Sequence, residues 1–258
     1  MEKSVRRAWH AVRAQLAGID PRAAAILISA TAIIVLARGD GTLAGYGPTL
    51  SKLFADRPWR AVVPDLYWFG SATLTFLLLP YLVLRLGLRL SPAEMGLGPG
   101  DWRLGLKIAG LLYALMLPVV AVASQLPGFA SHYPLCPYVG QQAAALLRGE
   151  PALAWAVAAH ELGYVLYFVA WEFLFRGFLT VALARYIGPL AVLVQTIPFA
   201  ILHLGKPQAE VYGSIAAGVA LGLLALRCRS IWWGLLLHVA VALTMDLGAI
   251  VARLRGIV

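Results

Sequence analysis

The chain has 258 residues, of which 61% are hydrophobic and only 13% are charged, with a mean hydropathy of +0.79. A soluble domain carries about 25% charged residues because it must cover itself with water-facing groups, so this composition excludes a water-soluble globular protein. Apolar stretches of about 18 or more residues recur along the chain. They predict an all-α, polytopic transmembrane helix bundle of about seven spans.

The net charge of +9 is spread over the ends of the expected helices. This distribution favours the anionic headgroups of a lipid bilayer as the partner of these charges, and we expect no nucleic acid partner. The two cysteines, Cys136 and Cys228, are far apart and form no C-x-x-C pattern. They indicate neither a disulfide framework nor a thiolate metal site.

Residues 1–22 are basic and predict a cytoplasmic segment at the membrane surface. No small-residue cleavage site follows the first apolar run, so we expect a retained first span and a single transmembrane domain over residues 23–258. The spans are expected at about 23–36, 66–86, 104–124, 152–186, 189–203, 211–226 and 231–251. The fourth is long enough that it must tilt or protrude.

The distribution of Lys and Arg predicts the orientation in the membrane. With the amino terminus inside, the inside loops are the basic ones: 85–107, the turn at Arg185, and 227–229. The outside loops after the third and fifth spans carry only Arg148 and Lys206 as cations, each near a glutamate. This asymmetry predicts a cytoplasmic amino terminus, and we expect the bacterial inner membrane. The loop 38–60 and the tail with Arg253 and Arg255 fit less well.

Ionisable residues inside a span cost about 2.5–3.5 kcal/mol each at the centre of a membrane helix. The first three spans have almost none, whereas the later part of the chain keeps several: His160, Glu161, Glu172, Arg176, His203, His238 and Asp246. We therefore expect the functional site in the bundle of the fourth, fifth and seventh spans.

Glu172 and Arg176 are four residues apart and share a helix face, with the glutamate on the favourable N-terminal side. Taken alone, they are a structural ion pair; alternatively, Arg176 orients Glu172, whose carboxylate handles protons or water. His203 ends the fifth span, where a helix C-terminus favours it. His238 lies inside the last span and needs a partner. One Glu and two His meeting at a buried point would suit water activation and oxyanion stabilisation, and they match the His₂Glu ligand set of catalytic zinc.

Two further pairs have simpler explanations. His160 and Glu161 lie near the outer end of the fourth span, and we expect a hydrated helix end there. Glu161 is also 11 residues from Glu172 and falls on nearly the same helix face. Glu210, with Lys206, is expected to cap the helix that follows, although it is close enough in sequence to His203 to reach the same site.

These residues, in this order, resemble the CPBP family of intramembrane proteases, which are related to the type II CAAX prenyl endopeptidases. The family pattern is Glu-Glu-x-x-x-Arg on one span, Phe-x-x-x-His on the next, and a later His that is often followed four residues on by Asn or Asp. The matching residues here are Glu172, Arg176, Phe199, His203 and His238. The resemblance covers about residues 164–246, with a weaker echo at Glu94, and the expected catalytic region is about 152–251.

Two positions depart from the family pattern. Trp171 replaces the first Glu, to which the family usually gives the water-activating role, and Ala242 replaces the Asn that helps to bind the oxyanion. Neighbouring helix residues point about 100° apart, so Glu172 cannot simply take the place of Trp171. Three outcomes stay open: a helix rotation makes Glu172 the working carboxylate, Glu210 or Glu161 replaces the lost one, or the chain is proteolytically silent.

The resemblance implies an intramembrane endopeptidase that cleaves a membrane-associated protein or peptide tail. Glu172 with His203 would polarise the attacking water, His238 would stabilise the oxyanion, and Arg176 would fix Glu172. The expected substrate has an apolar C-terminal segment, such as the sorting anchors of the family's myxosortase-type members; prenylated CAAX tails come second. A mechanism without metal is expected first. If zinc is present, its ligands would be the same glutamate and two histidines, although no H-E-x-x-H motif fixes them.

Two other functions remain as alternatives. The first is a non-proteolytic membrane protein on the same scaffold, an immunity or assembly factor, which Trp171 and Ala242 favour. The second is a small proton-coupled transporter that uses the buried Glu and His as a relay. The absence of an inverted repeat argues against the transporter.

Overall fold

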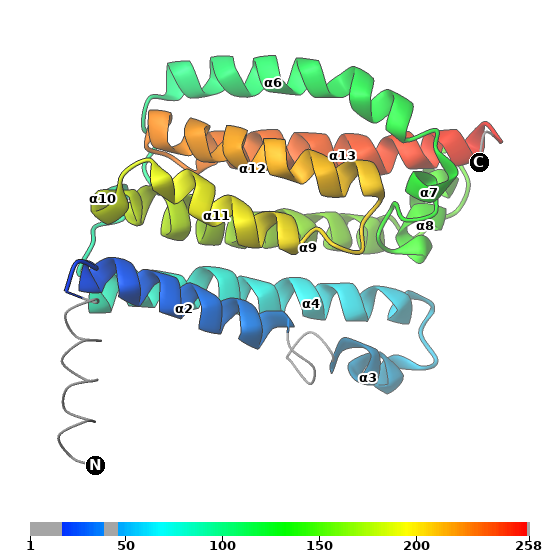
Figure 1. Cartoon of the computed structure of the whole chain (residues 1–258). Coiled ribbons are helices and arrows are strands. Elements are labelled where there is room, and N and C mark those ends of the chain that lie inside the picture. The colour runs from blue at the N-terminus through cyan, green and yellow to red at the C-terminus, as the bar shows by residue number, and fades with distance from the viewer. Residues whose placement is uncertain (1–16, 39–45, 257–258) are drawn as a thin grey trace, which may run out of the picture.

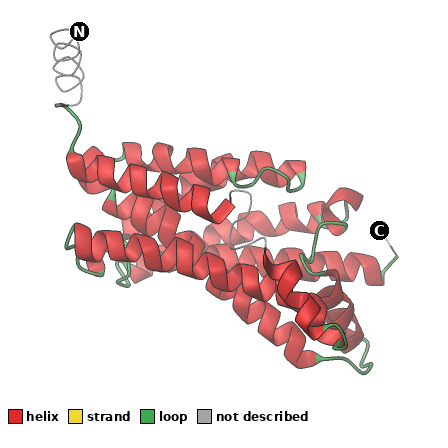
Figure 2. Ribbon diagram, turned by 90° about the horizontal axis from the view of Figure 1, so that it is seen from below, coloured by secondary structure: helices red, strands yellow, loops and turns green. Residues whose placement is uncertain are grey.

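The computed structural model describes residues 17–38 and 46–256, and every regular element within them is helical (Figure 2). Within these described ranges, six helical segments are long and apolar enough to cross a membrane. They are Pro21–Arg38, Pro58–Gly87, Trp102–Ala123, Ala154–Ile187, Gln208–Cys228 and Trp232–Leu254. The prediction of an all-α polytopic bundle is therefore confirmed, and the chain is an integral membrane protein.

The fifth expected span is shorter than predicted. Helix α11, Leu190–Ile201, has 12 residues and a length of about 18 Å at 1.5 Å per residue, against about 30 Å for the hydrocarbon core. In place of the roughly seven predicted spans, the described residues form six full-length segments and one short apolar helix. Most of the basic segment predicted at 1–22, and part of the loop 38–60, lie outside the described residues.

The amino-terminal elements are α2 (Pro21–Arg38), α3 (Gly47–Ser51), η2 (Lys52–Phe54), η3 (Pro58–Val62), α4 (Val63–Thr73), η4 (Leu74–Leu78), α5 (Leu79–Leu82), η5 (Val83–Gly87), η6 (Ala93–Met95), α6 (Trp102–Ala123), α7 (Pro127–Ala130) and α8 (Pro137–Leu147). The remaining elements are α9 (Ala154–Glu172), η7 (Phe173–Ala182), α10 (Ala184–Ile187), α11, α12 (Gln208–Cys228) and α13 (Trp232–Leu254). Figure 1 shows the long helices lying side by side in one bundle.

The fourth span, Ala154–Ile187, is the centre of the bundle. Of the residues in an 18-residue stretch of this span, 83% are buried within the protein. The corresponding share for α6, Trp102–Ala123, is 11%. Helix α4 packs against α9, both α11 and α12 pack against η7, and α13 packs against α9 and α6. His160, Glu172 and Arg176 of the fourth span are therefore surrounded by protein and not by lipid, which is where membrane proteins keep such residues.

The fourth span changes helix type directly after Glu172. Helix α9 is a regular α-helix that ends at this residue, and the following segment η7, Phe173–Ala182, is a π-helix. A π-helix forms i→i+5 hydrogen bonds and is frequent at functional sites. The rotation of about 100° per residue that is expected for an α-helix holds up to Glu172 and fails beyond it.

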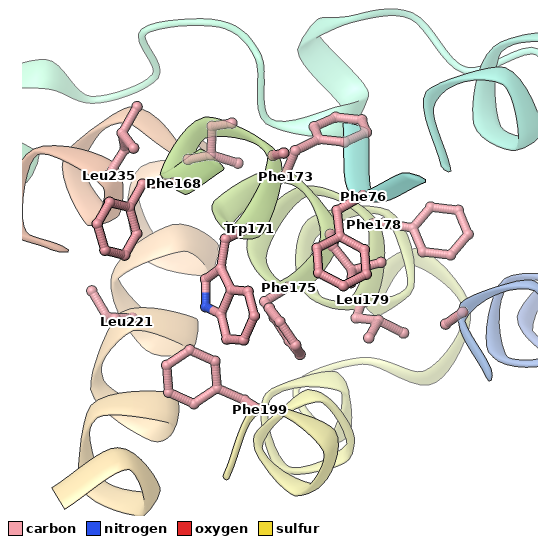
Figure 3. Packing of buried hydrophobic residues seen from close by; sticks show 14 of the residues in the cluster. Phe76, Phe168, Trp171, Phe173, Phe175, Phe178, Leu179, Phe199, Leu221 and Leu235 are labelled. Atoms are coloured by element: carbon pink, nitrogen blue, oxygen red, sulfur yellow. The ribbon is translucent and has the colours of Figure 1, made fainter. Parts of the chain in front are cut away.

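Aromatic side chains fill the space between the fourth span and α11 (Figure 3). The ring centroid of Trp171 lies 4.9 Å from that of Phe175 and 5.9 Å from that of Phe199. Phe175 and Phe199 meet edge to face, with centroids 5.2 Å apart, a favourable arrangement for aromatic pairs. These rings form an aromatic wall beside Arg176 and His203.

The loop between the second and third spans contains the short helix η6. An ion pair from η6 and two indole hydrogen bonds fix this loop to the bundle. Glu94 pairs with Arg185 at 2.7 Å. The indoles of Trp232 and Trp233 donate to the carbonyls of Leu97 and Pro99 at 2.8 and 2.9 Å. The weak family echo at Glu94 thus belongs to a loop that packs against the start of α13.

Candidate active site

Glu172 and His238 form the central contact of the site. Oε1 of Glu172 accepts a hydrogen bond from Nδ1 of His238 at 2.8 Å, and this bond joins the end of α9 to the middle of α13. With the proton on Nδ1, the Nε2 atom of His238 stays available for another partner. Glu172 is fully buried, whereas the His238 side chain is 18% exposed. The imidazole is therefore the accessible member of the pair.

Arg176 lies on the other side of the same carboxylate. Its Nε atom is 3.4 Å from Oε2 of Glu172, and both side chains are fully buried. The guanidinium also lies over the ring of Phe199, with Cζ 4.2 Å from the ring centroid. The ion pair predicted from the sequence is present, and it compensates a charge that would be very costly alone in the core.

Gly234 makes room for the carboxylate, and it is not among the site residues predicted from the sequence. A Cβ added at this position would lie 3.0 Å from Oε2 of Glu172. Gly234 is four residues before His238 and so lies on the same face of α13. That spacing is the only signal in the sequence, and glycine is too common in membrane helices for the spacing to identify it.

His203 faces the same aromatic wall from the turn after α11. Its Nδ1 atom is 2.7 Å from the carbonyl of Phe199. A carbonyl only accepts, so Nδ1 carries the proton and Nε2 of the neutral ring presents a lone pair. The Phe199 ring contacts both imidazoles, with centroid distances of 4.6 Å to His203 and 6.4 Å to His238. The structure therefore joins Glu172 directly to His238 and separates His203 from them by one aromatic ring.

Trp171 occupies the position that faces His203. Its indole meets the His203 ring edge to face, with centroids 5.8 Å apart and an interplanar angle of 79°. The next residue, Glu172, points to α13 instead. This difference follows the 100° step between helix neighbours, and the π-helix begins too late to rotate Glu172 into the place of Trp171. Ala242, the second departure, is buried in α13 and offers no polar group.

Neither of the other two glutamates replaces the missing carboxylate by a hydrogen bond to His203. Oε2 of Glu210 accepts from the Tyr133 hydroxyl at 2.5 Å, and Oε1 pairs with Lys206 at 2.6 Å. Burial and the adjacent Glu210 raise the pKa of Tyr133 far above its ordinary value, so the phenol remains a donor. Glu210 lies in the first turn of α12, but its carboxylate bonds to Tyr133 and Lys206 and caps no backbone N–H of that helix, so the predicted cap is not formed.

The expectation of a hydrated helix end at His160 is wrong. His160 is completely buried, with Nδ1 3.2 Å from Oε1 of Glu161 and Nε2 3.6 Å from Oδ2 of Asp65. The reason is tertiary: α4 packs closely on α9 here, and a Cβ added at Gly163 would lie 2.9 Å from the Phe69 ring.

The zinc ligand set considered from the sequence is not assembled at ligand distance. Among the described residues, a different group of three side chains, which includes His160, has its potential ligand atoms within 4.8 Å of one another. Glu172, His203 and His238 do not form such a group.

The part of the chain that holds these residues is similar to a known family. Residues 152–244 match the family model described as "Type II CAAX prenyl endopeptidase Rce1-like". No curated protein and no solved structure matches the chain. The matched segment begins just before α9, ends within α13 and contains the residues of the resemblance: Glu172, Arg176, Phe199, His203 and His238. Over this segment, about a third of the chain, the sequence is similar to the Rce1-like family of type II CAAX prenyl endopeptidases.

Proposed function

We propose that the chain is an intramembrane endopeptidase in which His203 activates water and the Glu172–His238 pair stabilises the oxyanion. The observation that carries the proposal is the 2.8 Å hydrogen bond between Oε1 of the fully buried Glu172 and Nδ1 of the partly exposed His238. A carboxylate held against one imidazole nitrogen fixes the ring and stabilises its protonated form.

In the proposed reaction, Nε2 of His203 takes a proton from water as the oxygen attacks the peptide carbonyl. Protonated His238, held by Glu172, donates from Nε2 to the developing oxyanion. His203 then gives its proton to the leaving amine as the C–N bond breaks. The role of Glu172 differs from the expectation that it polarises water with His203, because its carboxylate is inaccessible and bonded to His238.

The proposed substrate is a protein or peptide tail with an apolar C-terminal segment, which could reach a site between membrane helices. Sorting anchors and prenylated CAAX tails are two forms of such a tail. We further propose that the amino terminus is cytoplasmic, in the bacterial inner membrane, on the basis of the cationic loops. Reporter fusions at the two termini would test the orientation.

The experiment compares the purified full chain in liposomes with three single variants: Glu172→Gln, His203→Gln and His238→Gln. The probes are a fluorogenic farnesylated CAAX peptide and an unprenylated peptide with an apolar tail. His132→Gln is the matched control, because this partly exposed loop histidine lies outside the site. We expect cleavage of at least one probe, unchanged in the control and abolished in the three variants. Equal cleavage by all four variants would refute the proposal.

Trp171 gives one reason to keep the non-proteolytic alternative, because it fills the position that faces His203. The alternative predicts that the wild-type chain cleaves neither probe and that Trp171→Glu creates activity by placing a carboxylate beside His203. Our proposal predicts wild-type cleavage that Trp171→Glu does not increase. Proteolysis assays on these two proteins separate the two functions.

A further inference from the structure

Asp65, Cys136 and His160 come together at the end of the bundle where α9 begins. They belong to α4, to the residue before α8, and to α9, and one ligand atom from each lies within 4.8 Å of the other two. His160 and Cys136 are buried, and the Asp65 side chain is 23% exposed. A carboxylate oxygen, a sulfur and an imidazole nitrogen thus converge at one partly accessible point.

The orientation of His160 is the second observation. Its Nδ1 atom bonds to Oε1 of Glu161 at 3.2 Å, which leaves Nε2 directed toward Asp65. Nε2 is buried and forms no hydrogen bond within the described part of the chain. Histidines that bind metals commonly donate their other ring N–H to a carboxylate, which fixes the tautomer and the ring orientation. Glu161 and His160 have this arrangement.

We propose that Asp65, Cys136 and His160 bind a zinc ion. Zinc favours this mixture of sulfur, nitrogen and oxygen ligands, with bond lengths of about 2.0–2.3 Å. A tetrahedral ion separates such ligands by about 3.3–3.7 Å. The 3.6 Å between His160 Nε2 and Asp65 Oδ2 already falls in this range. The exposed side of Asp65 leaves the fourth position open to a water molecule.

The site would connect the segment that matches the family model to the part of the chain that precedes it. Asp65 and Cys136 precede the family segment at 152–244, and His160 lies inside it. The site is also separate from the proposed active site, since His160 and Glu172 are 12 positions apart on one α-helix, a rise of about 18 Å. The three ligands are distant in sequence and form no spaced motif, which explains why Cys136 gave no sign of a metal site.

The test measures metal content and spectra of the full chain purified in detergent. We expect one equivalent of zinc in the wild type after incubation with Zn²⁺ and dialysis. With Co²⁺ in its place, we expect a thiolate-to-metal charge-transfer band. Cys136→Ala should lose both, whereas Cys228→Ala, which removes the other buried cysteine, should retain both. Glu172→Gln and His203→Gln should also retain the metal, so that failure of the proteolysis proposal would leave this result unaffected.

Affinity provides a second measurement that does not depend on removing a ligand. Glu161→Gln retains all three ligands but weakens the partner of His160, and we expect its zinc affinity to fall about tenfold to a hundredfold. Zinc should also raise the melting temperature of the wild type but not that of His160→Gln. A wild-type chain that binds no zinc and gives no Co²⁺ thiolate band overturns the proposal, as does a band retained in Cys136→Ala.

Discussion

Gly234 of α13 lies directly against the carboxylate of Glu172: an added Cβ would be 3.0 Å from Oε2. The same carboxylate is held by His238 through Oε1 and by Arg176 beside Oε2. It therefore has little freedom to move away from an added methyl group. The absence of a side chain at position 234 is part of the geometry that brings glutamate and imidazole together.

Gly234→Ala should therefore damage the site without damaging the fold. Alanine is favoured over glycine in a helix by about 0.5–1 kcal/mol, which offsets part of the steric cost. A displacement of about 1 Å in a catalytic group can lower the rate on the order of a hundredfold, and we expect a loss of about tenfold to a hundredfold in peptide cleavage. Gly213→Ala on α12 is the matched control, because its Cβ would meet nothing within 4 Å. Equal activity of the two variants would contradict this account.

Glu172→Gln should lower stability as well as activity. It leaves the buried guanidinium of Arg176 without its ion pair, a change that costs about 3–5 kcal/mol. The double variant Glu172→Gln/Arg176→Met removes both charges and should recover most of the melting temperature in detergent while remaining inactive. If the double variant were as unstable as the single one, the ion pair would not be what Glu172 contributes to stability.

The membrane fold was predictable because hydropathy alone determines where apolar spans lie. Backbone groups in lipid must be satisfied within helices, so a long apolar run leaves few alternatives. The length of α11 was not predictable in this way, because Leu190–Ile201 is helical for only part of an apolar run that continues toward His203. The π-helix after Glu172 was also missed, since no residue pattern in Phe173–Ala182 distinguishes it from an α-helix.

The candidate site was predictable only in part. The cost of burying charge identified Glu172, Arg176 and His238, and the structure places these three in contact. The cost of burying charge could not indicate which imidazole the glutamate contacts, because that contact depends on how the helices pack. For the same reason His160 was misjudged: its burial comes from the contact between α4 and α9 and not from its own position in the sequence.

Trp171 should be needed mainly for packing. Its indole contacts Phe76, Phe175, Phe199 and His203. Trp171→Ala should leave a cavity and destabilise the protein by about 3–5 kcal/mol, measured as a lower melting temperature. Trp171→Phe retains an aromatic ring, and we expect it to preserve cleavage within a few-fold. A large gain of activity in either variant would indicate that the indole blocks access to His203.

Glu94 should make stability depend on pH in the acid range. Hydrogen bonds from the backbone and hydroxyl of Ser91, together with Arg185, hold its pKa below the ordinary 4.5. The unfolded chain therefore takes up a proton at higher pH than the folded one. The stabilising contribution is complete above about pH 4.5 and is lost as the pH falls through the lowered pKa of the folded state.

Glu94→Gln removes this carboxylate, so its melting temperature should fall less than that of the wild type between pH 6 and pH 3. Glu150→Gln serves as the comparison variant. The Glu150 carboxylate bonds to its near neighbour Arg148 and fixes no distant loop. An acid dependence that is identical in the wild type and Glu94→Gln would show that this loop contact contributes nothing to stability.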